Sequence, residues 1–534
     1  MRGDKGLDFK SMNHNKGSTT KETNDIILHP QPSDDPADPL NWRPSRRNAS
    51  IVINTFWCTM MQAAQTWTGP AFAIWNMELG IGMNDLNNGV AILVFMCGVG
   101  IMFMQPWALK FGRRAPYMAG SALMLAALSF GATMSSSGFY YAFCILAGFG
   151  ASPSFCVTET SLLDVTFLHQ RGRVLSLYSL AVGTGTFLSP VAAGYIIQGQ
   201  GWRWCFYYLL LFVGLAAFLV ALGSPETLFV RETPGVPSEP DTAIGTVQDD
   251  NDNATKPVSE QIPAVKRSSS FPTEGPAAES SAFARHSSSL TLFRRDTTIM
   301  ASFFWLTYSP FKLLQLPAVT WMTLMLSIQS FWVNLIITTQ AAFFAAPPYN
   351  FDSSQLGLMN LAMFIGILIG CVWGGPLTDT LIIYKSRQRN GISEAEDRLW
   401  MYTVVPIGIA GGVLLWGVGA SYGIPWIGPC IGLALLGFSI AALLPISQGY
   451  ALDSYPELAG GIIQVSNVLR NVIGGALSFA ITPWINHSGA KNASIAIAML
   501  GMFLNSLFVI FLWKGKELRR GTKESYLRLI LDQV

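Results

Sequence analysis

Amide side chains recur inside the long apolar runs of this sequence, where a polar group needs a hydrogen-bond partner and is costly without one. Such positions are candidates for binding a polar substrate. The candidates are Gln62, Gln65, Asn334, Gln340, Gln448, Gln464, Asn467 and Asn471. The spacing of Gln464, Asn467 and Asn471, i, i+3, i+7, places them on one helix face that could line a cavity. The alternative is that the amides hydrogen-bond between helices and only support packing.

Glu159 is the acidic residue that we favour for proton chemistry, because it lies within an apolar run. A carboxyl group in a low-dielectric environment favours its neutral form, so it can take up and release a proton. We therefore predict a proton-coupling role for Glu159. The alternative is an ion pair between Glu159 and a nearby arginine, namely Arg113, Arg171 or Arg173.

The chain shows no pattern of metal ligands and no motif of an enzyme. Its five histidines are scattered, and it contains no HExxH, GxSxG or phosphate-binding GxxxxGK[ST] sequence. Its seven cysteines lie in apolar runs without a CxxC pair, which is typical of small core residues. We therefore expect no metal, no cofactor, no enzymatic activity and no ATP-driven mechanism. The net charge of +2 gives no indication of nucleic-acid binding.

Long apolar runs must position these candidate side chains. The 534 residues are 50% hydrophobic and 12% charged, which is not typical of a soluble domain. The apolar runs are close to the ~20 residues that a membrane-spanning helix needs. We predict an all-α membrane protein with twelve transmembrane helices in two pseudo-symmetric six-helix halves. The predicted spans are 49–69, 88–108, 115–134, 139–159, 174–197, 203–223, 317–341, 355–377, 400–420, 425–448, 461–485 and 493–513.

A polar tract separates the two halves. It is rich in Ser, Pro, Thr and charge, and such a composition buries too little apolar surface to offset the entropy of ordering the chain. We expect it to be mostly disordered. The first 48 residues are hydrophilic, so we also expect no cleavable signal peptide. The predicted organisation is an N-terminal tail (1–48), a helical bundle (49–223), a central loop (224–316), a second bundle (317–513) and a C-terminal tail (514–534).

Lys and Arg accumulate at one end of the predicted bundle. The loops and tail at that end carry Lys110, Arg113, Arg114, Arg171, Arg173, Lys385, Arg387, Arg389, Arg398, Lys514, Lys516, Arg519, Arg520 and Lys523. The loops at the other end add little beyond Arg203 and Lys491. Because positive residues collect on the cytoplasmic side of a membrane protein, we expect both termini and the central loop to be cytoplasmic.

Two loops at matching positions of the halves carry a family resemblance. Residues 106–114 read PWALKFGRR and residues 374–379 read GGPLTD. Both resemble the GxLaDrxGRR loop motif of the major facilitator superfamily. Local strings such as DPLNW (38–42) and ALDSY (451–455) are similar to fungal members of its twelve-span drug:proton antiporter group. The fifth span is similar to the antiporter motif of this superfamily at Gly185, Ser189, Pro190 and Gly194, with Ser189 where Gly is usual.

The resemblance implies a gate at the two loops. The gating candidates are Lys110, Gly112, Arg113, Arg114, Asp164, Asp379, Asp453 and Arg470. In this fold an acid in either loop can cap the positive N-terminus of a helix in the opposing half. The first loop has Leu109 in place of that acid, so we predict a latch on one side only. The arginines of the first loop are then left to pair with Glu159 or Asp164.

The resemblance further implies secondary active transport by alternating access. We expect proton-coupled efflux of a small organic compound, either a drug or a fungal secondary metabolite; the alternative is uptake of a small polar solute or organic cation by proton symport. Cys144 stands where the family has an arginine associated with proton transfer, so the coupling route departs from the family's pattern. The expected partners are the substrate, protons and the lipid bilayer. We expect a monomer in the plasma membrane, with the vacuolar membrane as the alternative.

Overall fold

The computed structural model describes residues 22–23, 26–27, 38–167, 170–228, 303–345, 347–389 and 394–531. Residues 230–289 lie outside the described residues. The predicted N-terminal tail up to residue 37, apart from two two-residue strands, and most of the predicted central loop also lie outside them. Those strands, β1 (Glu22–Thr23) and β2 (Ile26–Ile27), pair antiparallel.

The first half is a bundle of helices whose ends coincide with helix-breaking residues. Pro44 begins the first helix, where its missing N–H costs nothing. Gly80 and Gly201 adopt positive φ values of 66° and 93° where the chain leaves one helix for the next. The helices are α1 (Pro44–Thr66), α2 (Phe72–Leu79), α3 (Met83–Phe111), α4 (Arg114–Ala132), α5 (Ser137–Ala151), α6 (Pro153–Asp164), α7 (Arg171–Gln200) and α8 (Arg203–Gly223).

The second half begins with a short helical segment that belongs to the end of the predicted central loop. This segment is α10 (Phe303–Tyr308) followed by a 3-10 turn (Ser309–Gln315). The remaining helices are α11 (Pro317–Phe344), α12 (Ser353–Val372), α13 (Thr378–Gln388), α14 (Val405–Val413), α15 (Gly419–Ser421), α16 (Ile427–Ser454), α17 (Ala459–Ser506), α18 (Phe508–Gly521) and α19 (Lys523–Leu531). A π-helical turn, Trp373–Leu377, joins α12 to α13, and a 3-10 stretch, Ala395–Val404, precedes α14.

Twelve helical spans result, as the hydropathy pattern predicts. Ten stretches of the described residues are long and apolar enough to cross a membrane. The last of these, Pro456–Gly521, holds two spans, because Gly489 interrupts α17 with a φ of 76°. The twelfth span is α1, whose hydropathy is lowered by polar residues such as Gln62 and Gln65.

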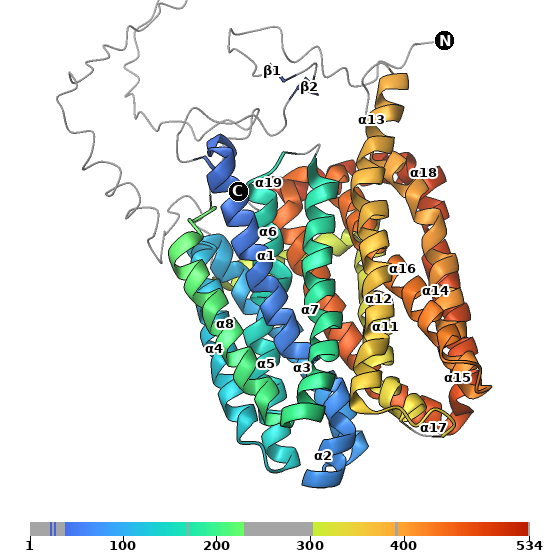
Figure 1. The fold of residues 1–534 in the computed structure, drawn as a ribbon. Helices are drawn as coiled ribbons and strands as arrows, with labels where there is room; N and C mark the ends of the chain where they lie inside the picture. Colours follow the sequence, from blue (N-terminus) through green and yellow to red (C-terminus); the bar gives the residue numbers. More distant parts are fainter. Residues whose placement is uncertain are drawn as a thin grey trace, which may run out of the picture. The chain divides into compact units, whose positions relative to one another are not determined.

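The two halves meet along two pairs of helices, α3 with α17 and α7 with α12. The second pair, α7 and α12, lies side by side in Figure 1. Small residues permit the close approach. A Cβ atom on Gly475 of α17 would lie 2.8 Å from the backbone nitrogen of Phe95 in α3. A Cβ atom on Gly194 of α7 would lie 2.5 Å from the carbonyl oxygen of Ser353 in α12. The two interfaces therefore depend on glycine at these positions.

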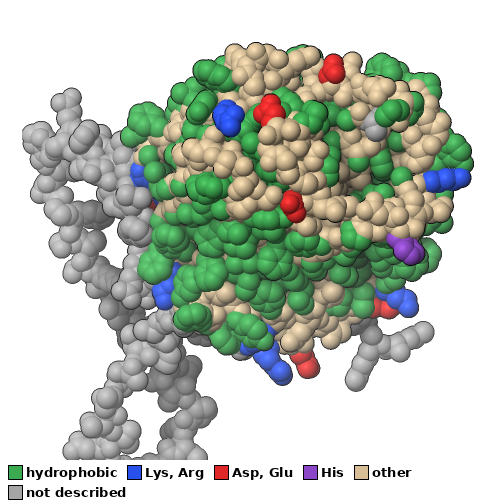
Figure 2. Space-filling model, turned by 90° about the horizontal axis from the view of Figure 1, so that it is seen from below, with side chains coloured by type: hydrophobic (Ala, Val, Ile, Leu, Met, Phe, Trp, Pro, Cys, Tyr) green, Lys and Arg blue, Asp and Glu red, His purple; other side chains and the backbone are tan. Residues whose placement is uncertain are grey.

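The two ends of the bundle differ in charge. We call the end at which α1 begins and α19 lies the basic end (Figure 1). The helix ends and loops at this end carry Arg113, Arg171, Arg398 and Arg519. The opposite end, which includes α2, presents many hydrophobic side chains with charged ones scattered among them (Figure 2). The asymmetry in the sequence is therefore an asymmetry in space.

Candidate transport cavity and gate

A cavity of about 90 Å³ lies in the interior, lined by helices of both halves. Of the residues predicted to bind substrate, the cavity is lined by Gln62, Gln65, Asn334 and Asn471. Gln329 and Arg470 also line it, together with apolar side chains such as Phe155 and Phe187. Arg470 was predicted to belong to the gate; it lines the cavity instead of joining the contacts at the basic end, and its gating role stays a prediction.

The amides that line the cavity are also held by neighbouring helices. Gln62 of α1 donates a hydrogen bond to the Ser154 hydroxyl at 2.9 Å. Asn334 of α11 donates to the Ser478 hydroxyl of α17 at 2.8 Å. The two explanations offered for the amides are therefore not exclusive, because the same side chain faces the cavity and links helices. Such partners fix the orientation of each amide.

Gln340, Gln448, Gln464 and Asn467 do not line the cavity, so their prediction as substrate-binding residues is not supported by their positions. Gln340 donates to the Leu356 carbonyl and accepts from Asn360, which is a packing role. Gln464 donates to the Leu306 carbonyl of α10 at 3.3 Å. The i, i+3, i+7 spacing gives a common helix face, but seven residues span ~10 Å of helix, so the three side chains lie at different depths.

Glu159 lies at the interface between the halves, with 1% of its surface exposed. Its carboxylate accepts hydrogen bonds from Asn467 of α17, at 3.1 Å, and from Gln448 of α16. The predicted alternative was an ion pair with Arg113, Arg171 or Arg173; among the described residues the partners of the carboxylate are these amides. Glu159 belongs to α6 of the first half, so both hydrogen bonds connect the two halves.

Asp379 connects the halves at the basic end. Its carboxylate accepts a hydrogen bond from the backbone N–H of Arg173, at 3.0 Å, in the first turn of α7. That N–H is one of the donors that a helix start leaves without an intrahelical partner. A Cβ atom on Gly172 would lie 2.1 Å from the Asp379 carboxylate, so glycine is needed for this approach. The acid of the second loop thus caps a helix of the first half.

Asp453 forms a second connection close to Asp379. It accepts from Arg398 at 2.9 Å and lies 3.4 Å from the guanidinium of Arg171 in α7. Arg398 also lies 3.6 Å from Asp379. One arginine of the second half therefore joins both acids, and Arg171 of the first half completes the group. We did not predict a site role for Arg398; its signal in the sequence was its place in the positive loop before α14.

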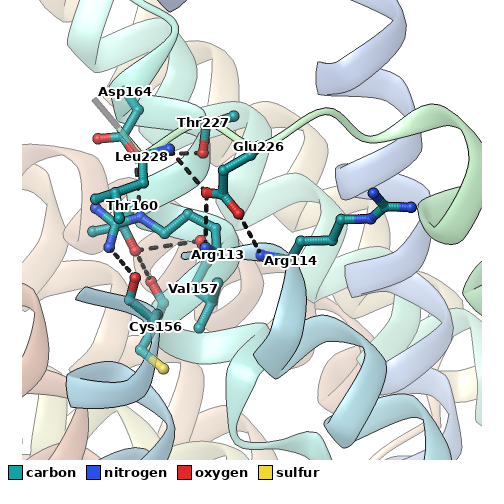
Figure 3. Close-up of polar contacts among 10 residues, drawn as sticks. Arg113, Arg114, Cys156, Val157, Thr160, Asp164, Glu226, Thr227 and Leu228 are labelled. Atoms are coloured by element: carbon teal, nitrogen blue, oxygen red, sulfur yellow. Dashed lines mark hydrogen bonds and ion pairs between the residues drawn. The ribbon is translucent and has the colours of Figure 1, made fainter. Parts of the chain in front are cut away.

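Arg113 and Arg114 of the first loop hydrogen-bond to residues of the first half (Figure 3). The backbone N–H groups of Arg113 and Arg114 donate to the Glu226 carboxylate at 2.8 and 3.2 Å, which caps the start of α4. The side chain of Arg113 pairs with Asp164 at 3.2 Å. Gly112, with a φ of 104°, leaves room for Glu226, because a Cβ atom would lie 2.5 Å from the carboxylate. We did not predict a role for Glu226, although the string Pro225-Glu226-Thr227 was visible in the sequence.

The remaining predicted residues lie in structural contacts. Lys110 is half-buried at the end of α3. The antiporter-like residues of α7 pack against helices on both sides. A Cβ atom on Gly185 would lie 2.3 Å from the Thr59 carbonyl of α1, and the Ser189 hydroxyl lies 3.3 Å from that of Thr66. On the other side, Pro190 contacts Gly357 of α12.

The family model described as Major Facilitator Superfamily matches residues 55–479. The chain belongs to the major facilitator superfamily.

Relatives within this superfamily cover nearly the whole chain. An uncharacterized MFS-type transporter of Schizosaccharomyces pombe is 29% identical over 95% of this chain and 90% of its own length. The efflux pump radE of Floropilus chiversii is 24% identical over 88% of this chain and 81% of its own. Among solved structures, the proton:xylose symporter XylE aligns with a TM-score of 0.57 at 13% identity, covering 88% of this chain and 97% of the symporter. This last likeness establishes the fold.

Proposed function

We propose that this major facilitator transporter couples protons to the export of a small organic compound by alternating access. The observation that carries the proposal is Glu159, a buried carboxylate that joins the two halves through Gln448 and Asn467. Membership of the superfamily supports transport of a small solute. Export is supported by the name of a relative, an efflux pump, and by the antiporter-like residues of α7.

Protonation of Glu159 changes the contact between the halves. The ionised carboxylate accepts from both amides, whereas the protonated acid has lost its charge and one acceptor oxygen has become a donor. A hydrogen bond to a charged group contributes ~1.5–3 kcal/mol, so weakening one shifts the balance between two conformations by ~10-fold or more. Proton binding at Glu159 therefore favours separation of the halves.

Helix α17 links the proton site to the cavity. Asn467 contacts Glu159, and Asn471, one turn further along, lines the cavity and donates to the Asn467 carbonyl at 2.8 Å. Arg470 lines the cavity and interacts electrostatically with Glu159. Occupation of the cavity and protonation of Glu159 thus act on adjacent turns of one helix, which gives a physical route for coupling.

The contacts of Asp379 and Asp453 at the basic end form the gate of this proposal. They hold the first turn of α7 against the second half, and they must break when the halves separate at that end. The abundance of Lys and Arg supports the placement of the basic end in the cytoplasm.

Transport in sealed vesicles, with and without a pH gradient, tests the proposal. We expect a pH gradient to drive flux of one or more compounds from a panel of labelled organic acids, amines and uncharged aromatics. Glu159→Gln should abolish the response to the gradient and retain binding, because glutamine keeps the size but cannot ionise. Glu457→Gln, at an exposed acid of the basic end, is the matched control. Gradient-driven flux that is unchanged in Glu159→Gln would assign Glu159 to structure alone.

A further inference from the structure

Arg470 is a buried cation in the wall of the cavity. Its side chain is 5% exposed, and its guanidinium carbon lies 5.3 Å from the centre of the Phe155 ring. Its Nε and Nη1 atoms are buried without a hydrogen-bond partner among the described residues. A guanidinium remains protonated in a protein, so these donors cannot be removed by loss of a proton. A buried charge with unpaired donors is costly.

Three arginines nearer the basic end pair with acids, whereas Arg470 pairs with no acid that the structure describes. Arg113 pairs with Asp164, and both Arg171 and Arg398 pair with Asp453. The titratable groups that interact electrostatically with Arg470 are Tyr178, Glu159 and Cys97. Of these only Glu159 is an acid, and its carboxylate already accepts from Gln448 and Asn467. Among the described residues, Arg470 therefore lacks the direct carboxylate partner that these three arginines have.

The cavity around Arg470 has no negative group of its own. Among the described residues that line it, none is Asp or Glu, and Arg470 is the one with a charged side chain. The polar remainder consists of neutral amides and hydroxyls, and much of the wall is apolar, including Phe143, Phe155 and Phe187. A ligand complementary to this cavity has an apolar body and one group that accepts hydrogen bonds from a guanidinium.

We propose that the transported compound is a small organic anion, and that its carboxylate binds the guanidinium of Arg470. The planar guanidinium matches a carboxylate in a two-bond contact, which a lysine cannot reproduce. The aromatic side chains then pack against the apolar body of the compound. This inference rests on the proposed transport function and specifies its substrate class. It disfavours an organic cation, which Arg470 would repel.

The size of the cavity limits the compound in this conformation. Its volume of about 90 Å³ is well below the ~300–1,000 Å³ of sites that enclose drug-sized ligands. A carboxylate on a compact apolar body is therefore favoured over a large molecule.

Equilibrium binding to the purified full-length protein tests the charge requirement. The probes are benzoate and phenylacetate, their uncharged counterparts benzamide and phenylacetamide, and the cation benzylamine. We expect both carboxylates to raise the melting temperature and to bind at least ~10-fold more tightly than the amides, as expected for a charged hydrogen bond. If neither carboxylate binds, or if an amide or the amine binds as tightly, the proposal is overturned.

Variants of Arg470 locate the binding. Arg470→Gln should abolish carboxylate binding, and Arg470→Lys should weaken it by ~10-fold or more, because charge remains but the two-bond contact is lost. Lys491 is exposed and contacts Tyr422. Lys491→Gln also removes one positive charge, and this variant should bind the carboxylates as tightly as the unaltered protein does. Retained binding in Arg470→Gln would refute the assignment. Should that variant fail to fold, the comparison of carboxylate with amide in the unaltered protein still decides the substrate class.

The outcome is separable from that of the proposed function, because equilibrium binding needs no pH gradient. Carboxylate binding at Arg470 without gradient-driven flux would reject proton coupling and leave the substrate class standing. Gradient-driven flux of benzylamine would reject the anionic substrate class and leave proton coupling standing.

Discussion

Three charged side chains within the bundle, Glu159, Asp379 and Arg470, have different partners and therefore different consequences. Glu159 bonds to amides of the other half, Asp379 to a helix start of the other half, and Arg470 interacts with Phe155. The first two hydrogen bonds exist only while the halves are together. A change of charge at either residue therefore alters the conformational equilibrium.

The two loop motifs are expected to respond differently to substitution. Asp379→Asn removes the charge that caps α7, and an acid at a helix start contributes ~0.3–1 kcal/mol, up to ~2 when partly buried. We expect a strong loss of transport and a several-fold rise in opening at the basic end. Leu109→Ala should be mild, because Leu109 is half-buried and carries no charge.

Opening at the basic end can be measured by the reaction of Cys144, which lines the cavity, with a membrane-impermeant maleimide after the other cysteines are replaced. Gly172→Ala provides a second disruption of the same cap, since its Cβ would meet Asp379. Gly199→Ala, on the same helix with open space around it, is the matched control. Equal, small effects of Asp379→Asn and Leu109→Ala would contradict the one-sided latch.

At the level of elements, α10 lies across the contact between the halves. Thr307 of α10 donates to the Met102 carbonyl of α3 at 3.3 Å, and Gln464 of α17 donates to the Leu306 carbonyl at 3.3 Å. The following 3-10 turn is anchored by Leu313, which is fully buried. The end of the central loop therefore touches a helix of each half and resists their separation.

Removal of these two bonds should favour opening at the basic end. A hydrogen bond contributes ~0.5–1.5 kcal/mol net, so Thr307→Val combined with Gln464→Leu should raise the rate of Cys144 labelling by a few-fold or more. Thr133→Val, which removes an exposed bond within one turn at the other end, should leave labelling unchanged. An unchanged rate in the double variant would show that α10 does not restrain the gate.

For the whole molecule, the unequal distribution of charge between the two ends determines its expected orientation. The basic end carries the arginines of the gate and the ends of α1 and α18. Transfer of that many cations across a bilayer is unfavourable. The same end holds the contacts that close the proposed gate, so we expect this gate to face the cytoplasm.

Tags test this orientation. An epitope at residue 260, which lies outside the described residues, and another at the C-terminus should both be inaccessible to antibody in sealed, right-side-out cells. Both should become accessible after permeabilisation. A tag that is detected in intact cells would reverse the orientation and place the gate outside.

The sequence by itself determined the twelve spans. The twelve spans follow from local hydropathy, and the capping role considered for Asp379 follows from a loop motif, because both are properties of neighbouring residues. Only the tertiary structure decided the partners. Glu159 meets Gln448 and Asn467 across 289 and 308 residues of chain, and Glu226 meets Arg113 across 113. Spacing on a helix gives the face of a side chain but not its depth, which is why Asn471 lines the cavity and Gln464 does not. Depth is set by how helices distant in sequence pack together.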